Sequence, residues 1–124
     1  MKIYLAGPIF LTGDDECKVW RDRAKVRLAG HDVFDPMIRD YRGCTDEHYA
    51  EIVEADKREI DTCDVILVNH TRPSVGTSME ILYAWERNKR IIMVVHGKDI
   101  SPWLLYHSEK IFHDLDAAID YLNG

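Results

Sequence analysis

The stretch VILVNHTRPSVGTSMEI, residues 65–81, joins an apolar run to a turn and then to a segment of helical character. The run at 65–68 shows no alternation of apolar and polar residues, which is typical of a strand buried on both faces. Strands of this kind occur in parallel sheets that carry helices on each side. The stretch therefore predicts an α/β fold.

The same change from strand to helix repeats along the whole chain. We expect strands at residues 2–6, 31–34, 64–69, 90–95 and 110–112. We expect helices at residues 16–28, 46–61, 77–88, 101–106 and 114–122. Because helical crossovers join parallel strands, residues 1–124 are predicted to form one domain. Its expected architecture is a five-stranded parallel sheet with helices on both faces, flavodoxin- or Rossmann-like in strand order.

Composition narrows the class of partner. The chain has 124 residues, 46% of them apolar, and a net charge of −6. An acidic chain without a stripe of lysine or arginine is a poor candidate for binding a nucleic acid polymer. The N-terminal apolar run is too short to span a membrane. We therefore expect a small molecule or another protein as the partner, and neither a nucleic acid polymer nor a membrane.

Cysteine and histidine spacing argues against cross-links and metals. Cys17, Cys44 and Cys63 are odd in number, and no two have CxxC spacing, which disfavours a disulfide framework and a structural zinc site. The six histidines show no metal-ligand spacing. We expect a reducing, cytoplasmic location and no metal or other cofactor.

A ligand site is expected where the parallel strands end. Ligands of such sheets bind beyond the carboxyl ends of the strands, where the strand order reverses. The loops at that edge are residues 7–15, 35–45, 69–76 and 96–101. Two tight turns in them suit a close approach of the backbone to a ligand, Gly7-Pro8 and Ser74-Val75-Gly76.

One carboxylate lies where an apolar residue is expected. Asp56 falls on the apolar stripe of the helix at 46–61, which is marked by Tyr49, Ile52, Val53 and Ile60. An unpaired buried charge is expensive. Asp56 therefore has either a structural partner or a functional role.

A second carboxylate, Glu80, lies near the predicted start of the helix at 77–88. In a first turn, the helix dipole would favour its ionised form. Thr77 and Glu80 also match a capping box, with Thr77 as the N-cap. The capping interpretation predicts that Glu80 faces solvent. The catalytic interpretation predicts that it faces the crevice at the strand ends.

Two carboxyl groups at one crevice suit the cleavage of a glycosidic bond. One attacks or stabilises the anomeric carbon, and the other assists the leaving group or orients the substrate. Tyr4, in the first strand, would reach the same crevice with a hydroxyl that could hold a carboxylate in place. The alternative for Tyr4 is a ring packed in the core.

Three segments carry a resemblance to a known family. They are KIYLAGPIF at 2–10, EADKREIDTCDVILV at 54–68 and PSVGTSMEILYAWERNKRII at 73–92. Together they resemble the nucleoside 2-deoxyribosyltransferase family over most of the chain. The combination is more specific than any single piece, because a lone GTxxE is a weak signal.

The resemblance implies roles for individual residues. Glu80 matches the nucleophile, which forms a covalent deoxyribosyl intermediate and passes the sugar to a second base or to water. Asp56 matches an aspartate that contacts base or sugar and is associated with proton transfer, and Tyr4 matches the tyrosine that orients the nucleophile. Family members form dimers or larger homo-oligomers with shared active sites. Ser101-Pro102-Trp103 matches the loop donated by the neighbouring subunit.

Other residues are candidates for substrate contact. Asp35, at the end of the second strand, either touches the base or forms a turn with Pro36. Phe10 and Trp103 are aromatic candidates for stacking on the base. Ser74 and Gly76 would hold the 5′ end of the sugar. The full set of expected binding residues is Gly7, Pro8, Phe10, Asp35, Ser74, Gly76, Ser101 and Trp103.

The sequence departs from the family pattern at the 5′ end of the substrate. Members acting on free nucleosides often carry Asp and Asn where Ser74 and Ser101 stand. The serines look more like the related deoxynucleoside 5′-monophosphate N-glycosidases, because an Asp would repel a phosphate. Those hydrolases have an arginine in the first loop, where this chain has Phe10. Substitutes for that arginine, unless they are ordinary surface charges, are Arg39, Arg42 and Arg72.

Three functions are therefore expected in order. The first is cleavage of the N-glycosidic bond of a 2′-deoxyribonucleoside through Glu80, with transfer of the sugar to a free nucleobase. The second is hydrolysis of a deoxynucleoside 5′-monophosphate to free base and deoxyribose 5-phosphate. The third is a non-catalytic nucleotide-binding module, which would be favoured if Glu80 and Asp56 faced different sides of the domain.

Overall fold

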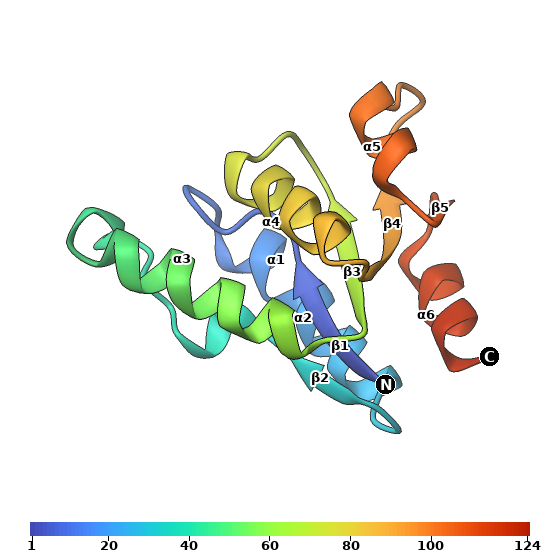
Figure 1. Ribbon diagram of the computed structural model, residues 1–124, viewed down its shortest axis with the longest axis horizontal. Helices are drawn as coiled ribbons and strands as arrows, with labels where there is room; N and C mark the ends of the chain where they lie inside the picture. Colours follow the sequence, from blue (N-terminus) through green and yellow to red (C-terminus); the bar gives the residue numbers. More distant parts are fainter.

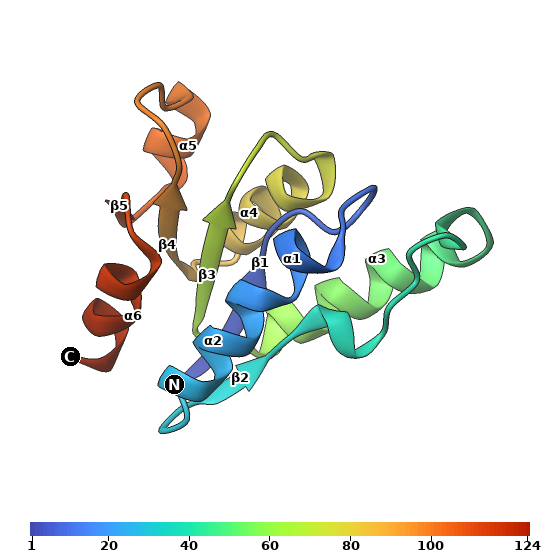
Figure 2. The ribbon, with the colours of Figure 1, turned by 180° about the vertical axis from the view of Figure 1, so that it is seen from behind.

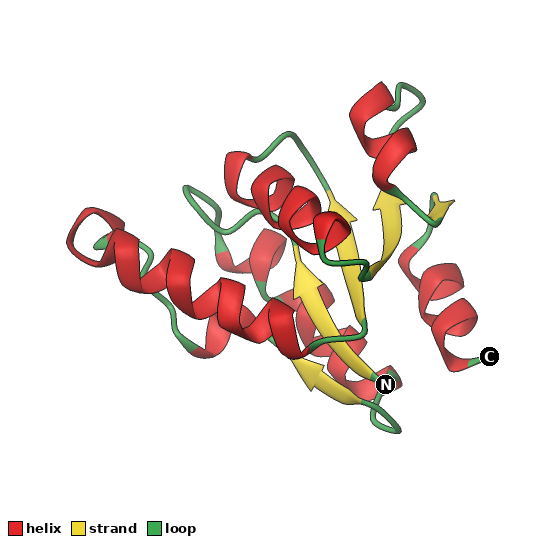
Figure 3. Ribbon diagram, viewed as in Figure 1, coloured by secondary structure: helices red, strands yellow, loops and turns green.

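The apolar run at 65–68 lies in β3 (Val65–His70), at the centre of a parallel sheet. The computed structural model describes residues 1–124. Its five strands have the order β2-β1-β3-β4-β5, and all neighbours are parallel. The remaining strands are β1 (Lys2–Ala6), β2 (Asp32–Phe34), β4 (Arg90–Val95) and β5 (Lys110–Phe112). The predicted fold class and strand order are confirmed (Figure 3).

Helices cover both faces of the sheet (Figures 1 and 2). A short 3₁₀ helix, η1 (Pro36–Ile38), follows β2. One face carries α1 (Asp14–Cys17), α2 (Val19–Arg27) and α6 (Leu115–Asn123). The other face carries α3 (Thr45–Thr62), α4 (Val75–Glu86) and α5 (Pro102–His107). None of these helices combines the length and the apolar character needed to cross a bilayer.

Each central strand contributes side chains to two separate cores. Ile3 and Leu67 belong to the core under α2 and α6, together with Trp20. Tyr4 and Ile66 belong to the opposite core under α3 and α4. Because both faces of a strand are buried, every second residue cannot be polar. This explains the continuous apolar run at 65–68.

Helix α4 begins earlier than the sequence predicts. Its N-cap is Ser74, whose hydroxyl accepts a hydrogen bond from the Thr77 amide at 3.4 Å. Thr77 is a buried residue inside the helix, so the predicted capping box of Thr77 and Glu80 is wrong. Two hydroxyls three residues apart can each cap a helix, and the earlier one does so here. Glu80 consequently lies in the second turn of α4.

The predicted helix at 16–28 is divided into α1 and α2 at Lys18. The interruption is small, because the Lys18 amide still bonds the Asp14 carbonyl at 2.8 Å. The other predicted elements agree with the observed ones to within two residues at each end.

Gly7, directly after β1, lies where the chain passes closest to its neighbours. A Cβ at this position would be 3.0 Å from the Asn69 carbonyl oxygen and 3.0 Å from the Trp20 ring. Both neighbours belong to the packed interior and have little freedom to move. The absence of a side chain at Gly7 therefore allows the loop after β1 to lie against β3.

We expect Gly7→Ala to lower the free energy of unfolding by about 1–3 kcal/mol, because it overpacks this contact. Gly13→Ala is the matched control, since a Cβ there meets nothing within 4 Å. It should change stability by less than about 0.5 kcal/mol. Urea unfolding of both variants makes the comparison, and equal losses would contradict the proposed close packing.

Candidate active site

A cavity of about 500 Å³ opens beyond the carboxyl ends of β1 and β2, between α3 and α4. The loop after β1 contributes Gly7 and Phe10, and the start of α4 contributes Ser74 and Gly76. These four predicted binding residues line one space. Pro8 is buried and does not line it. The position of the cavity agrees with the rule for parallel sheets.

Helix α3 explains why a carboxylate interrupts an apolar stripe. Its first half extends past the edge of the sheet (Figure 1). Ile52, Val53, Asp56 and Ile60 all line the cavity. The stripe therefore faces a ligand-sized space rather than only a packed core. Asp56 needs no apolar surroundings on that side.

Tyr4, Glu80 and Asp56 form the centre of the site. The Tyr4 hydroxyl donates a hydrogen bond to Glu80 Oε2. The Tyr4 ring is buried and stacks on Phe34, with ring centroids 5.6 Å apart, so both interpretations of Tyr4 hold at once. Glu80 and Asp56 line the same cavity. Glu80 thus faces the crevice, as the catalytic interpretation requires.

Burial makes both carboxyl groups weak acids. It raises the pKa of Glu80 to about 8, assisted by the charge of Asp56 and opposed by the Tyr4 hydroxyl. Burial also raises the pKa of Asp56 to about 6, opposed chiefly by the charge of Arg39. The expectation that the helix start keeps Glu80 ionised is therefore wrong. Glu80 lies beyond the first turn, where the dipole effect fades, and is enclosed by protein.

The two carboxyl groups act as a coupled pair. Two such groups in one enclosed space do not ionise independently, because each charge opposes the other. Near neutral pH the pair therefore holds about one proton. An empty cavity with one proton and one negative charge can serve a reaction that needs both an acid and an anionic nucleophile.

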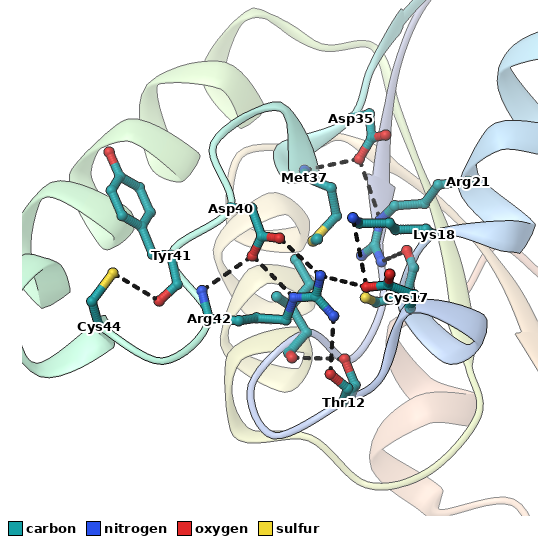
Figure 4. Close-up of polar contacts among 12 residues, drawn as sticks. Thr12, Cys17, Lys18, Arg21, Asp35, Met37, Asp40, Tyr41, Arg42 and Cys44 are labelled. Atoms are coloured by element: carbon teal, nitrogen blue, oxygen red, sulfur yellow. Dashed lines mark hydrogen bonds and ion pairs between the residues drawn. The ribbon is translucent and has the colours of Figure 1, made fainter.

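Arg21, which the sequence analysis missed, holds two loops together behind the cavity. It is fully buried, and its guanidinium donates to the carbonyls of Cys17 at 2.7 Å and Gly7 at 3.0 Å. Its Nε lies 3.6 Å from Asp35 Oδ1 (Figure 4). The helical spacing of Cys17, Trp20, Arg21 and Ala24 was the signal that placed Arg21 on a buried face.

Asp35 is a structural residue in this arrangement. Its carboxylate accepts hydrogen bonds from the Met37 amide at 2.9 Å and from Lys25 Nζ at 2.8 Å. It does not line the cavity, although the neighbouring Pro36 does. The turn-forming alternative is therefore the one that the geometry supports, and the expected contact of Asp35 with a base is not.

The two expected residues near α5 lie elsewhere in the chain. Ser101 caps α5 through the Trp103 amide at 3.2 Å. Trp103 is 72% exposed and stacks on His107 with centroids 6.0 Å apart. Neither lines the cavity of its own chain. Their contact with a neighbouring subunit's site stays a prediction.

Two of the three candidate arginines line the cavity. Arg42 is held by Asp40 at 2.8 Å and Asp14 at 2.6 Å, and it also donates to the Thr12 carbonyl (Figure 4). Arg39 lines the cavity without an ion pair. Arg72 does not line it and instead binds Glu16 at 2.9 Å.

No group of three or more His, Cys, Asp or Glu side chains is placed to hold a metal ion. The chemistry that the cavity offers therefore comes from carboxyl, hydroxyl and guanidinium groups. Such groups bind and rearrange a small polar substrate through proton transfer and electrostatics.

Comparison with known proteins adds a family. The model of the nucleoside 2-deoxyribosyltransferase family matches residues 3–112. No curated protein sequence matches the chain. Among solved structures, a 2-deoxyribosyltransferase from Bacillus psychrosaccharolyticus superposes with a TM-score of 0.79 at 21% identity, covering 98% of this chain and 92% of that one.

Two further structures share the fold. A CMP N-glycosidase from Clostridium botulinum has a TM-score of 0.66 at 20% identity, with all of both chains covered. A conserved protein from Enterococcus faecalis has a TM-score of 0.73 at 14% identity, covering 98% of this chain and 96% of its own. At these identities the likeness shows the fold alone.

The raised pKa of Glu80 predicts a stability that depends on pH. The protonated form is the favoured one in the folded chain, so its contribution is complete below the ordinary value of 4.5 and is lost as pH rises through about 8. Glu80→Gln is neutral throughout. Relative to the natural chain, we expect this variant to gain at least about 1.4 kcal/mol between pH 5 and pH 8, the equivalent of one pKa unit.

Urea unfolding at pH 5, 6, 7, 8 and 9 measures this difference. Glu86→Gln is the control, because Glu86 is exposed on the same helix. It should leave the pH dependence of stability unchanged. A constant offset between Glu80→Gln and the natural chain across the series would contradict the enclosed position of Glu80.

Proposed function

Because the chain belongs to the nucleoside 2-deoxyribosyltransferase family, we propose that it cleaves the N-glycosidic bond of a 2′-deoxyribonucleoside and transfers the deoxyribose to another nucleobase. The observation that carries this proposal is the meeting of Glu80 and Asp56 in one cavity, with Tyr4 bonded to Glu80. A non-catalytic module loses its main support, since it was favoured only if these carboxyl groups faced different sides.

The proposed reaction has two balanced halves. Glu80, as carboxylate, attacks C1′ of the sugar while the C1′–N bond breaks and its electron pair goes to the departing base. Asp56 supplies the proton that neutralises the base. In the second half, a nitrogen of the incoming base attacks C1′, its proton returns to Asp56, and Glu80 leaves. The single proton of the carboxyl pair is available for the first half.

The start of α4 would hold the 5′ end of the sugar. Ser74 and Gly76 line the cavity there, and the first amides of the helix are directed outward as donors. These groups suit a 5′-hydroxyl. They would also suit a phosphate, because helix N-termini bind anions.

Hydrolysis of a deoxynucleoside 5′-monophosphate is the second candidate. The absence of a carboxylate at Ser74 favours it, and a CMP N-glycosidase shares the fold. The state of Arg42 counts against it, because Asp40 and Asp14 already neutralise that guanidinium. Phe10 in place of a first-loop arginine counts against it as well. The free nucleoside is therefore our first choice.

We also propose that the chain assembles as a homodimer or larger homo-oligomer with shared sites. Trp103 and Tyr106 on α5 are 72% and 69% exposed, and both lie next to Trp85, which is 40% exposed. Exposed aromatic clusters of this kind mark protein contacts. A cytoplasmic location stays a prediction from cysteine usage.

Substrate assays test the reaction directly. The protein is incubated with deoxynucleosides and with their 5′-monophosphates, each with and without an acceptor base, and free and exchanged bases are followed by chromatography. We expect exchanged product from nucleosides when an acceptor is present. Base release from monophosphates alone would overturn the first choice in favour of the second.

Glu80→Ala should lower turnover by about 10³-fold or more, because it removes the attacking atom. Glu86→Ala, on the exposed side of the same helix, should retain full activity. Unfolding curves for both variants exclude a general loss of structure. Full activity in Glu80→Ala would refute the assignment of the nucleophile.

Tyr4→Phe tests the role of the hydroxyl. The Tyr4 hydrogen bond lowers the pKa of Glu80 against the effect of burial. A carboxylate nucleophile is active when ionised, so the rate rises with pH through its pKa. Removing the hydroxyl should move this rise to higher pH and lower kcat about 10-fold at pH 7, with KM little changed. An unshifted pH–rate profile would show that Tyr4 does not act on Glu80.

A further inference from the structure

We propose that Arg39 selects the departing base, by donating hydrogen bonds to a base edge that presents two neighbouring acceptors. 6-Oxopurines present such an edge through O6 and N7, and cytosine does so through N3 and O2. Adenine and uracil each place a donor beside an acceptor. This inference rests on the proposed function, because it assigns the specificity of the same cavity.

Arg39 differs from the other arginines around the cavity in having no carboxylate partner. No Asp or Glu oxygen lies within 4.0 Å of its guanidinium, whereas Arg42 has two such partners and Arg21 has one. Its Nη2 is enclosed by protein and has no hydrogen-bond partner. A buried charged donor without a partner is costly. A ligand atom in the cavity is the partner that the protein itself does not supply.

Packing holds Arg39 in place despite the missing ion pair. Its guanidinium lies over the Phe34 ring, 5.6 Å from the centroid, and Phe34 in turn stacks on Tyr4. A cation over an aromatic face is stabilised by the electron density of the ring. The planar edge of the guanidinium is therefore set relative to the catalytic hydroxyl, which is the condition for bidentate recognition.

The order of the strands places Arg39 on the base side of the substrate. Arg39 follows β2, Ser74 follows β3, and β1 with Tyr4 lies between them. If Ser74 holds the 5′ end and C1′ lies over Glu80, the base extends toward the segment after β2. Arg39 also opposes the burial effect on the pKa of Asp56, so its charge acts beside the proposed proton donor.

The same contact would assist the reaction. When the C1′–N bond breaks, the electron pair left on the ring nitrogen spreads onto the exocyclic oxygen of an oxo base. A guanidinium aimed at that oxygen stabilises the developing charge without transferring a proton. Arginine is suited to this task because it stays charged at all accessible pH values. The proton still comes from Asp56.

The test compares substrates that differ in one base edge. For the natural chain, kcat/KM should be higher for deoxyinosine than for deoxyadenosine, and higher for deoxycytidine than for deoxyuridine. Arg39→Met should lower each ratio at least 10-fold, as expected when a bidentate contact to a base is lost. Arg39→Lys should restore only part of each ratio, because an ammonium lacks the planar fork.

Controls separate base selection from a structural role. Arg58→Met removes an exposed arginine of α3 that does not line the cavity, and it should leave both ratios unchanged. Equal losses on all four nucleosides in Arg39→Met would mean that Arg39 only supports the site, and would overturn the proposal. A change confined to the ratio of monophosphate to nucleoside would assign Arg39 to phosphate, and would also overturn it.

A binding measurement makes the result independent of turnover. Calorimetric titration with free hypoxanthine and free adenine should show tighter binding of hypoxanthine, with the preference lost in Arg39→Met. If no substrate is turned over but this preference is found, the proposed function fails and the base contact stands. If turnover is found and neither variant alters any base preference, the proposed function stands and the role of Arg39 is refuted.

Discussion

The hydrogen bond from the Tyr4 hydroxyl to Glu80 joins the central sheet to α4, and the site is arranged around it. Tyr4 belongs to β1 and stacks on Phe34 of β2, so packing determines where its hydroxyl lies. Glu80 is thereby held at the cavity wall by a rigid element rather than by a loop. A reactive carboxyl group supported in this way needs little rearrangement to meet a substrate.

Enclosing two carboxyl groups raises the free energy of their ionised forms, and the chain offsets this effect only in part. Arg21 lowers the pKa of both Glu80 and Asp56, and Arg39 lowers that of Asp56, but burial outweighs them. The folded chain therefore keeps a proton that the unfolded chain would release at neutral pH. Functional sites often retain such unfavourable groups at the expense of stability. Here the retained proton is the one that the proposed reaction requires.

Three arginines close to the cavity illustrate how surroundings decide the use of one residue type. Arg21 is buried and ties the loops after β1 and β2 to each other. Arg42 closes a surface network with two aspartates. Arg39 has a cavity on one side and an aromatic ring beneath it, and it lacks an ion pair. Nothing in their immediate sequence neighbours distinguishes these three situations.

Local patterns accounted for the fold and for the two carboxyl groups. The five strands, their parallel order and the helices between them follow from hydrophobic periods that a short stretch of chain already contains. Asp56 on its apolar stripe and Glu80 after the Ser74–Gly76 turn were conspicuous for the same reason. The helix start was misassigned because Ser74 and Thr77 are both competent caps, and only the path of the preceding loop chooses between them.

The sequence by itself determined the α/β architecture and the candidate pair Glu80 and Asp56, because both depend on residue spacing within single elements. Only the tertiary structure decided that Glu80 is enclosed and weakly acidic, that Asp35 is bound to Lys25, and that Arg39 has no carboxylate partner. These properties depend on atoms brought together from loops far apart in the chain. Burial and charge pairing act through space, and they exist only once the strands have paired.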